Sequence, residues 1–218
     1  MMLSERLKKI ALLIPKDSNV ADIGCDHGYL LIYLKDSGFA GKLLGVENKI
    51  GPLTSFRNNL KSKGYLDSIK YSLSDGLKDV DETYDTVVIA GMGYDSIKKI
   101  VDDSLEKIGH IKSFIIDSHT KEYEIRKLFT KLGYMIDSEL ILKEKGIFYE
   151  IIRFVRGNSN YNEMELHFGP LLMKEKSQIF LEKWQNKYEN NKKIITKIND
   201  NKKVSKLTED CKLIAKLF

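Results

Sequence analysis

The sequence is poor in cysteine and in long apolar runs, and both scarcities exclude classes of protein. Its 218 residues contain two cysteines, Cys25 and Cys211, which lie far apart and lack metal-ligand spacing. No run approaches the roughly 18 consecutive apolar residues that a membrane-spanning helix needs. The opening residues, Met1–Arg6, lack the apolar segment of a secretion signal. We therefore expect a reduced, cytoplasmic protein with no metal site, no membrane contact and no obligate protein partner.

Positive charge is concentrated at one end of the chain. The net charge is +5, and residues 157–218 hold twelve lysines, no arginine and eight acidic residues, which contributes +4. A lysine-rich excess on a small module is typical of a protein that binds a phosphate backbone. An ordinary solvated helical surface explains the same charge equally well.

Short β-rich segments alternate with helical patterns between residues 18 and 156, which is typical of βαβ units. Residues 143–146 are too short to join parallel strands, so the segments on either side must form an antiparallel hairpin. Five parallel strands followed by such a hairpin predict an α/β fold with a Rossmann-like, seven-stranded methyltransferase sheet. The predicted strands are Asn19–Ile23, Lys42–Glu47, Ile69–Leu73, Tyr84–Ala90, Ser113–Asp117, Tyr134–Leu142 and Ile147–Val155.

Helical spacing marks both ends of the chain. Apolar residues recur at helical intervals from Leu3 to Ile14, and Pro15 ends that helix. After residue 160 the strand signals stop, and two apolar stripes predict an antiparallel helical hairpin in which the aromatic residues serve core packing. The stripes contain Phe180, Trp184, Tyr188, Ile194, Ile195 and Ile198, then Leu207, Cys211, Ile214 and Leu217. We expect two domains, a catalytic unit over 1–157 and a small α-helical hairpin over 158–218.

The segment Asp22–Tyr29 predicts a strand, a tight turn and the start of a helix. Its glycines let the backbone bend sharply and approach a ligand, and the helix N-terminus offers free N–H groups. A dinucleotide-binding loop would read G-x-G-x-x-G, whereas here the glycines are Gly24 and Gly28 only, with Asp22 before them. This spacing favours the amino-acid end of S-adenosylmethionine, and His27 is a further candidate contact.

The ends of three later strands supply the remaining cofactor candidates. Glu47 comes 23 residues after Gly24, the offset at which a carboxylate reaches ribose hydroxyls, although it could instead only cap its loop. Asn48 follows it, and Asp75 is placed to meet the adenine amino group. Because open α/β sheets bind ligands at the carboxyl ends of their strands, the conjunction is more specific than any single residue. The cofactor candidates after the first loop are Glu47, Asn48, Asp75, Gly76, Gly91, Met92 and Gly93.

Several strings together resemble the bacterial tRNA (adenine-22-N1)-methyltransferases. The resemblance runs from about residue 3 to 185 and rests on Ile14–Lys16, Ala21–Leu30, Asn48–Leu53, Ala90–Gly93, Tyr149–Ile152 and Phe168–Leu172. It implies a class I methyltransferase fold, a C-terminal coiled-coil-like domain and methylation of tRNA at N1 of adenine 22. The chain departs from the family pattern at Glu47, at Tyr94 and at Asp117–His119, and the last two border the expected target pocket.

The chemistry of that reaction suggests roles for two residues. Adenine N1 must be unpaired or flipped out, and a carboxylate near the base would orient it and stabilise its developing charge. Asp26 is the candidate for this role. Tyr29 is the candidate wall of the base pocket, although it could equally be packing in the first helical turn. The Asn-Pro-Pro-Tyr motif that holds an exocyclic amine is missing after the fourth strand, which favours ring-nitrogen chemistry.

The predicted tRNA contacts lie on the C-terminal hairpin. Lys183, Lys187, Lys192 and Lys193 are expected outside the apolar seam, together with Lys174 and Lys176, and some of them should contact phosphates. Three other interpretations stay open at this point. They are a small-molecule methyltransferase on the same fold, a catalytically silent tRNA-binding protein and a nicotinamide enzyme.

Overall fold

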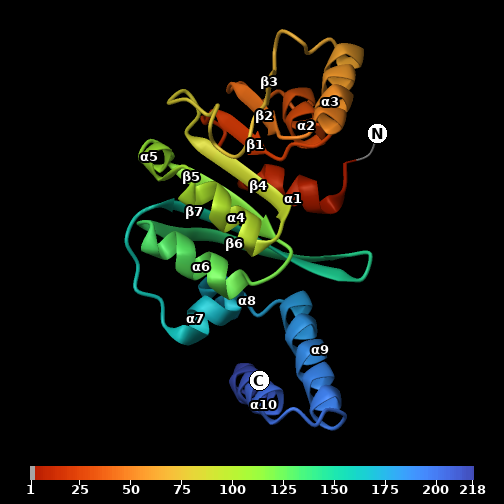
Figure 1. Ribbon diagram of the computed structural model, residues 1–218, viewed down its shortest axis with the longest axis vertical. Helices are drawn as coiled ribbons and strands as arrows, with labels where there is room; N and C mark the ends of the chain where they lie inside the picture. The colour runs from red at the N-terminus through yellow and green to blue at the C-terminus, as the bar shows by residue number, and fades with distance from the viewer. Residues whose placement is uncertain (1–2) are drawn as a thin grey trace.

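The protein is built on one seven-stranded sheet, seen in a computed structural model that describes residues 3–218 (Figure 1). The strand order is β3-β2-β1-β4-β5-β7-β6, in which β1 to β5 pair in parallel and β7 pairs antiparallel with both neighbours. The predicted fold class and all seven strands are therefore confirmed. The strands are β1 Val20–Ile23, β2 Leu43–Glu47, β3 Lys70–Leu73, β4 Thr86–Met92, β5 Ser113–Ser118, β6 Tyr134–Glu144 and β7 Ile147–Arg156.

Helices cover both faces of the sheet because its central strands are apolar on both sides. In β4, Val87 and Ile89 pack into one apolar cluster and the intervening Val88 packs into the other. The first cluster includes residues of α4, α5 and α6, and the second includes residues of α1, α2 and α3. The helices are α1 Glu5–Leu13, α2 Tyr29–Asp36, α3 Ile50–Lys63, α4 Tyr94–Asp102, α5 Leu105–Ile108 and α6 Glu122–Lys131.

The hairpin of β6 and β7 is longer than the sequence pattern predicts. Both strands extend beyond the expected ends, so the joint is the two-residue turn Lys145-Gly146 rather than residues 143–146. Lys145 and Gly146 both have left-handed backbones, with φ of 50° and 82°, which suits a tight two-residue turn. The alternation of apolar and polar residues was too weak near the turn to predict these additional strand residues.

The C-terminal segment forms the predicted hairpin and two short helices that the stripes did not reveal. In Figure 1, α7, α8, α9 and α10 lie beyond the β6 edge of the sheet, and α8 and α9 both contact β6. Phe168 and Leu172 of the short helices share one apolar cluster with Phe180 and Trp184. The elements are α7 Glu163–Phe168, α8 Pro170–Glu175, α9 Gln178–Ile195, α10 Asn201–Ile214 and a 3-10 helix at Ala215–Leu217.

One predicted seam residue is on the surface. Ile194 is 39% exposed. At about 100° per residue it lies roughly 80° around α9 from Trp184, whereas Ile195 lies about 20° from it. Ile195 is half-buried, as expected for a residue near the seam. The division of the chain at residue 157 stays a prediction.

Candidate active site

A cavity of about 670 Å³ opens at the carboxyl ends of the parallel strands. This lies within the range of about 300–1,000 Å³ typical of small-molecule sites. Ten of the predicted site residues line it: Asp22, Gly24, Asp26, Tyr29, Glu47, Asn48, Asp75, Gly76, Gly91 and Met92. Four separate segments of the sequence thus converge on one site, as the position of the strand ends predicts.

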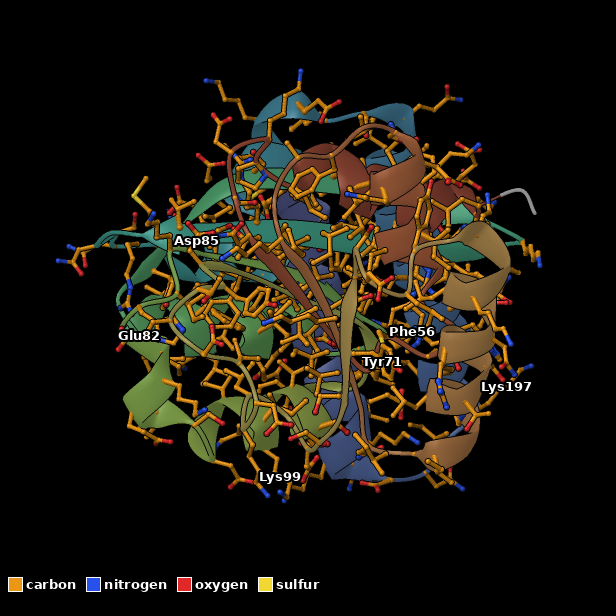
Figure 2. All side chains as sticks on the ribbon, turned by 90° about the horizontal axis from the view of Figure 1, so that it is seen from above. Phe56, Tyr71, Glu82, Asp85, Lys99 and Lys197 are labelled. Carbon is orange, nitrogen blue, oxygen red and sulfur yellow. The ribbon has the colours of Figure 1, made fainter. Side chains whose placement is uncertain are left out.

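The first loop is shaped by close packing around its glycines. Gly24 has a φ of +70°, and a Cβ atom there would lie 2.2 Å from the Met92 methyl group. Gly28 has a φ of +71°, and its missing side chain makes room for the Phe56 ring. Phe56 in turn meets the edge of Tyr71, and the two labelled rings lie near each other in Figure 2. Packing against Phe56 therefore requires glycine at position 28. Gly24, by contrast, lines the cavity, and its left-handed backbone and the nearby Met92 methyl group favour glycine there.

Three predicted cofactor contacts, His27, Gly28 and Gly93, are not among the residues that line the cavity. The His27 backbone carbonyl accepts a hydrogen bond from Asn59 at 3.0 Å, which ties the loop to α3. Gly93 caps the start of α4 and has room for a side chain, so nothing in its surroundings demands glycine. Direct cofactor contact by these three residues stays a prediction.

Glu47 organises the loop from the end of β2. Its Oε1 accepts from the backbone N–H groups of Asn48 and Lys49, both at 2.9 Å. Its Oε2 accepts from the Asp26 N–H at 3.2 Å. A carboxylate can accept about four hydrogen bonds, so one position on Oε2 remains for a ligand hydroxyl. The loop-capping and ligand-binding interpretations are therefore compatible.

Asp22 is buried beside Glu47 at the end of β1. Burial and the Glu47 charge raise the pKa of Asp22 to about 7. The carboxyl group is only 5% exposed yet lines the cavity. A cation in the cavity would favour its ionised form. Its surroundings therefore suit a positively charged ligand group.

Asp26 and Tyr29 project from the other end of the loop. Asp26 has a left-handed backbone with φ of 50°, a conformation that Asp tolerates better than most residues. Its side chain is 61% exposed and lies 3.6 Å from His27 Nε2. Tyr29 begins α2, and its ring centroid lies 5.4 Å from that of His27. Both residues line the cavity, Asp26 as an exposed and Tyr29 as a half-buried residue.

Arg6 and His119 line the cavity beside Gly91 and were not predicted as site residues. Arg6 Nη1 donates to Asp117 Oδ2 at 2.6 Å, and its guanidinium lies 5.1 Å from the centre of the Tyr149 ring. Burial raises the pKa of Asp117, and the nearby Arg6 charge opposes that rise. Arg6 is a charged residue within the apolar stripe of the first helix, and this anomaly could have marked it as a site residue.

The sequence resemblance placed Tyr94 at the border of the target pocket, but Tyr94 is not among the residues that line the cavity. It begins α4 and is half-buried against the apolar cluster that includes α4, α5 and α6, and Lys121 Nζ lies 5.2 Å from its ring centre. His119 lines the cavity, and Asp117 accepts a hydrogen bond from Arg6, which lines it too. The departure at Asp117–His119 therefore does concern the site, while the one at Tyr94 does not.

Lys183 is not the exposed RNA contact that the sequence predicts. Its side chain is 15% exposed and donates to Glu122 at 2.8 Å and to the buried Glu150 at 2.7 Å. Glu150 also accepts from Arg126 at 2.6 Å, and Arg126 donates to Glu139 at 2.8 Å. Helical spacing placed Lys183 outside the seam with α10, but that side of α9 faces β7 and α6. The prediction for Lys183 is therefore wrong.

The remaining predicted lysines on the C-terminal segment are exposed: Lys174, Lys176, Lys187, Lys192 and Lys193. Lys187 and Lys192 lie over the rings of Trp184 and Tyr188, at 5.0 and 5.3 Å. Lys192 and Lys193 occupy the last turn of α9. The ammonium groups of Lys174, Lys187, Lys192 and Lys193 are thus available to an anionic partner, whereas Lys176 Nζ donates to the Leu217 carbonyl at 2.8 Å.

Within residues 3–218, no helix is long and apolar enough to cross a bilayer. No group of three or more His, Cys, Asp or Glu side chains in this range is arranged to hold a metal ion. Cys25 and Cys211 are both free, and Cys25 is buried at the loop.

Comparisons with known proteins agree with the geometry. A family model described as TrmK, tRNA (adenine(22)-N(1))-methyltransferase, matches residues 20–217. A tRNA (adenine(22)-N(1))-methyltransferase of Bacillus subtilis is 30% identical over 204 residues, covering 90% of this chain and 86% of the relative.

Two solved structures are similar over almost the whole chain. The structure of M. capricolum TrmK with S-adenosyl-homocysteine has a TM-score of 0.88 at 29% identity, and the match covers 99% of this chain and 97% of that one. A Streptococcus pneumoniae protein in complex with S-adenosyl-L-methionine has a TM-score of 0.92 at 29% identity, with 99% of each chain covered.

Proposed function

The chain belongs to the tRNA (adenine(22)-N(1))-methyltransferase family, and we propose from this premise how its residues divide the reaction between them. The protein is an S-adenosylmethionine-dependent methyltransferase that acts on N1 of adenine 22 in tRNA. Family membership sets aside the nicotinamide and small-molecule alternatives. From the tRNA substrate we infer that it works in the cytoplasm.

The observation that carries the proposal is the cavity at the strand ends, because its donor and acceptor groups match the methyl donor in order along the sheet. When bound, S-adenosylmethionine would supply an electrophilic methyl carbon on its sulfonium, which the N1 lone pair of adenine attacks while the carbon–sulfur bond breaks and S-adenosylhomocysteine leaves. Glu47 offers its free Oε2 position to a ribose hydroxyl. Asp75, two residues after β3, lies near Asn48, with Asn48 Nδ2 3.5 Å from Asp75 Oδ1. Asp22 is placed to bind the cationic end through its carboxylate.

Asp26 and Tyr29 are the proposed acceptor-side residues. Asp26 accepts a hydrogen bond from the adenine N6 amine, which orients N1 and stabilises the positive charge that the ring gains. Tyr29 walls the base. Alignment of the base with the methyl group supplies much of the rate in such an in-line displacement. Neither role demands a metal ion.

The exposed lysines of the C-terminal segment are proposed to contact tRNA phosphates. Lys187, Lys192 and Lys193 lie on α9, and Lys174 lies on α8; none of them lines the cavity, so they position the RNA without reading its sequence. The Lys183 ammonium is excluded because Glu122 and Glu150 already hold it. The division of labour is then chemistry at the strand ends and part of the RNA affinity on α9.

A charge-reversal experiment tests the RNA role. The variant Lys187→Glu, Lys192→Glu, Lys193→Glu should bind S-adenosylmethionine normally and bind tRNA more weakly. Each lost phosphate contact should reduce the slope of log K against log salt by about 0.7–0.9.

The matched control reverses Lys42, Lys61 and Lys131, which are exposed near the amino ends of the strands, opposite the cavity. The control should retain the tRNA affinity of the parent. Equal affinities for the two triple variants would mean that the α9 lysines are ordinary solvated surface.

A further inference from the structure

The cavity has a second side, formed by α1 and by the ends of β4 and β5. In the sheet order, β1 separates this side from β2, which ends at Glu47, and from β3, which Asp75 follows. Its prominent groups are the Arg6 guanidinium and the His119 imidazole. A methyl donor seated against β2 and β3 leaves this side to the molecule that receives the methyl group.

Gly91 shows how closely these two groups converge. A Cβ atom on Gly91 would lie 3.4 Å from Arg6 Nη1 and 3.7 Å from His119 Nε2. The next residue, Met92, reaches the cofactor loop at Gly24. Arg6 and His119 therefore approach Gly91, which directly precedes Met92. Met92 is the β4 residue that contacts the methyl-donor loop.

Arg6 is held in a fixed orientation. Its partner Asp117 is fully buried at the end of β5, and the Tyr149 ring lies against the guanidinium. Among residues 3–218, Asp117 Oδ2 is the hydrogen-bond acceptor found for Arg6, whose guanidinium carries five N–H donors. The side chain is 22% exposed, so donors remain that can reach a ligand in the cavity.

The ligand chemistry follows from the charge of the reaction. Adenine gains positive charge when N1 is methylated, so a guanidinium against its ring would oppose the reaction. The phosphate of the same nucleotide keeps its negative charge and fits the forked donors of arginine. A base taken out of its stack enters a pocket with its phosphate at the mouth.

We propose that Arg6 binds the phosphate of the acceptor nucleotide, with Asp117 as the positioning residue that aims it and His119 beside it as part of the same subsite. This rests on the proposed function, because it assumes a tRNA nucleotide as the acceptor. It assigns the α1 side of the cavity to the RNA backbone and leaves the base itself to Asp26 and Tyr29.

The test compares two variants with one control. Arg6→Lys keeps a cation beside Asp117 and so keeps the ion pair, but it loses the forked donors. Arg6→Gln with Asp117→Asn removes both charges together, which avoids an unpaired buried carboxylate. Lys8→Gln is the control, since Lys8 lies on the same helix and pairs with Glu5 outside the cavity.

We expect both Arg6 variants to bind S-adenosylmethionine like the parent by calorimetry. Their kcat/KM for tRNA should fall by about tenfold or more, which corresponds to one charge-assisted hydrogen bond. The salt slope of tRNA binding should become shallower by about 0.7–0.9 in the double variant. Lys8→Gln should match the parent in all three measurements.

Three results would overturn the proposal. Parent-like kcat/KM in Arg6→Lys and in the double variant would remove Arg6 from the acceptor subsite. An equal loss of S-adenosylmethionine affinity would assign it to the methyl donor, and an unchanged salt slope would rule out the phosphate. A parent protein that leaves tRNA unmethylated contradicts the proposed function instead, so the two failures are distinguishable.

Discussion

Replacing Lys183 by Met should destabilise the protein strongly, because it breaks a buried ion network. Arg126 and Glu139 are fully buried, and Glu150 is 1% exposed. Burial raises the pKa of Glu150, but Lys183 and Arg126 more than offset it, so its pKa lies below the ordinary value. Without Lys183, two buried carboxylates share the single Arg126 cation.

The magnitude follows from what remains after the change. Removing one partner of a buried pair costs about 3–5 kcal/mol. Arg126 still holds Glu150, and Met fills the volume of the lysine stem, so we expect a loss of about 2–4 kcal/mol in the free energy of unfolding. Lys187→Met, on the next turn of α9, should cost no more than about 0.5 kcal/mol because Lys187 is exposed.

Urea unfolding followed by tryptophan fluorescence measures this difference. Trp184 is the single tryptophan, it is 4% exposed, and it adjoins Lys183 on α9. The direction in which this stability loss changes with pH is a further check. A depressed Glu150 pKa stabilises the fold above about pH 4.5 and less as pH falls below it, so the penalty of Lys183→Met should shrink in acid.

A double variant separates lost charge balance from lost packing. Lys183→Met with Glu150→Gln leaves Arg126 paired with Glu139, one charge against one. It should be more stable than Lys183→Met alone. If Lys183→Met and Lys187→Met unfold at the same urea concentration, the network does not hold α9 to the sheet and the reasoning is refuted.

Three further predictions concern the cavity. Glu47→Ala should weaken S-adenosylmethionine binding by about tenfold or more in calorimetry, since a ribose contact and three loop hydrogen bonds are lost, and an unchanged affinity would reject this role. Asp26→Asn, which suits the left-handed backbone better than Ala, should lower the single-turnover rate on tRNA far more than cofactor affinity; a rate close to that of the parent would exclude Asp26. Because the pKa of Asp22 is about 7 and a bound cation favours its carboxylate, S-adenosylmethionine affinity should strengthen as pH rises through 7 with release of a proton. Asp22→Asn should abolish that dependence, and a wild-type affinity that stays flat between pH 6 and 8 would contradict it.

The sheet and the cofactor side of the cavity could be predicted because local patterns specify them. Strand-length apolar runs and the turn at Gly24 are properties of short segments, and parallel strands bring their ends together whatever the details of packing. The β2 carboxylate, Glu47, could be identified from its offset alone. Its three backbone partners could not, because they depend on the exact path of the loop.

The errors fall where distant segments meet. Helical spacing places Lys183 on a polar face, but no local pattern indicates that Glu150 of β7 lies 2.7 Å away, across 33 residues. Arg6 and Asp117 are 111 residues apart, and although each departs from the pattern of its own segment, no local pattern indicates that they form a pair. The short helices α7 and α8 have too few turns for periodicity to show.

The central claim is tested most directly by incubating the purified protein with unmodified tRNA and S-adenosylmethionine labelled in the methyl group, then mapping the labelled nucleoside. Label should appear as 1-methyladenosine at position 22, and a tRNA carrying guanine at that position should take up none. No label in tRNA, or label at another position or on the exocyclic amine, would contradict the claim.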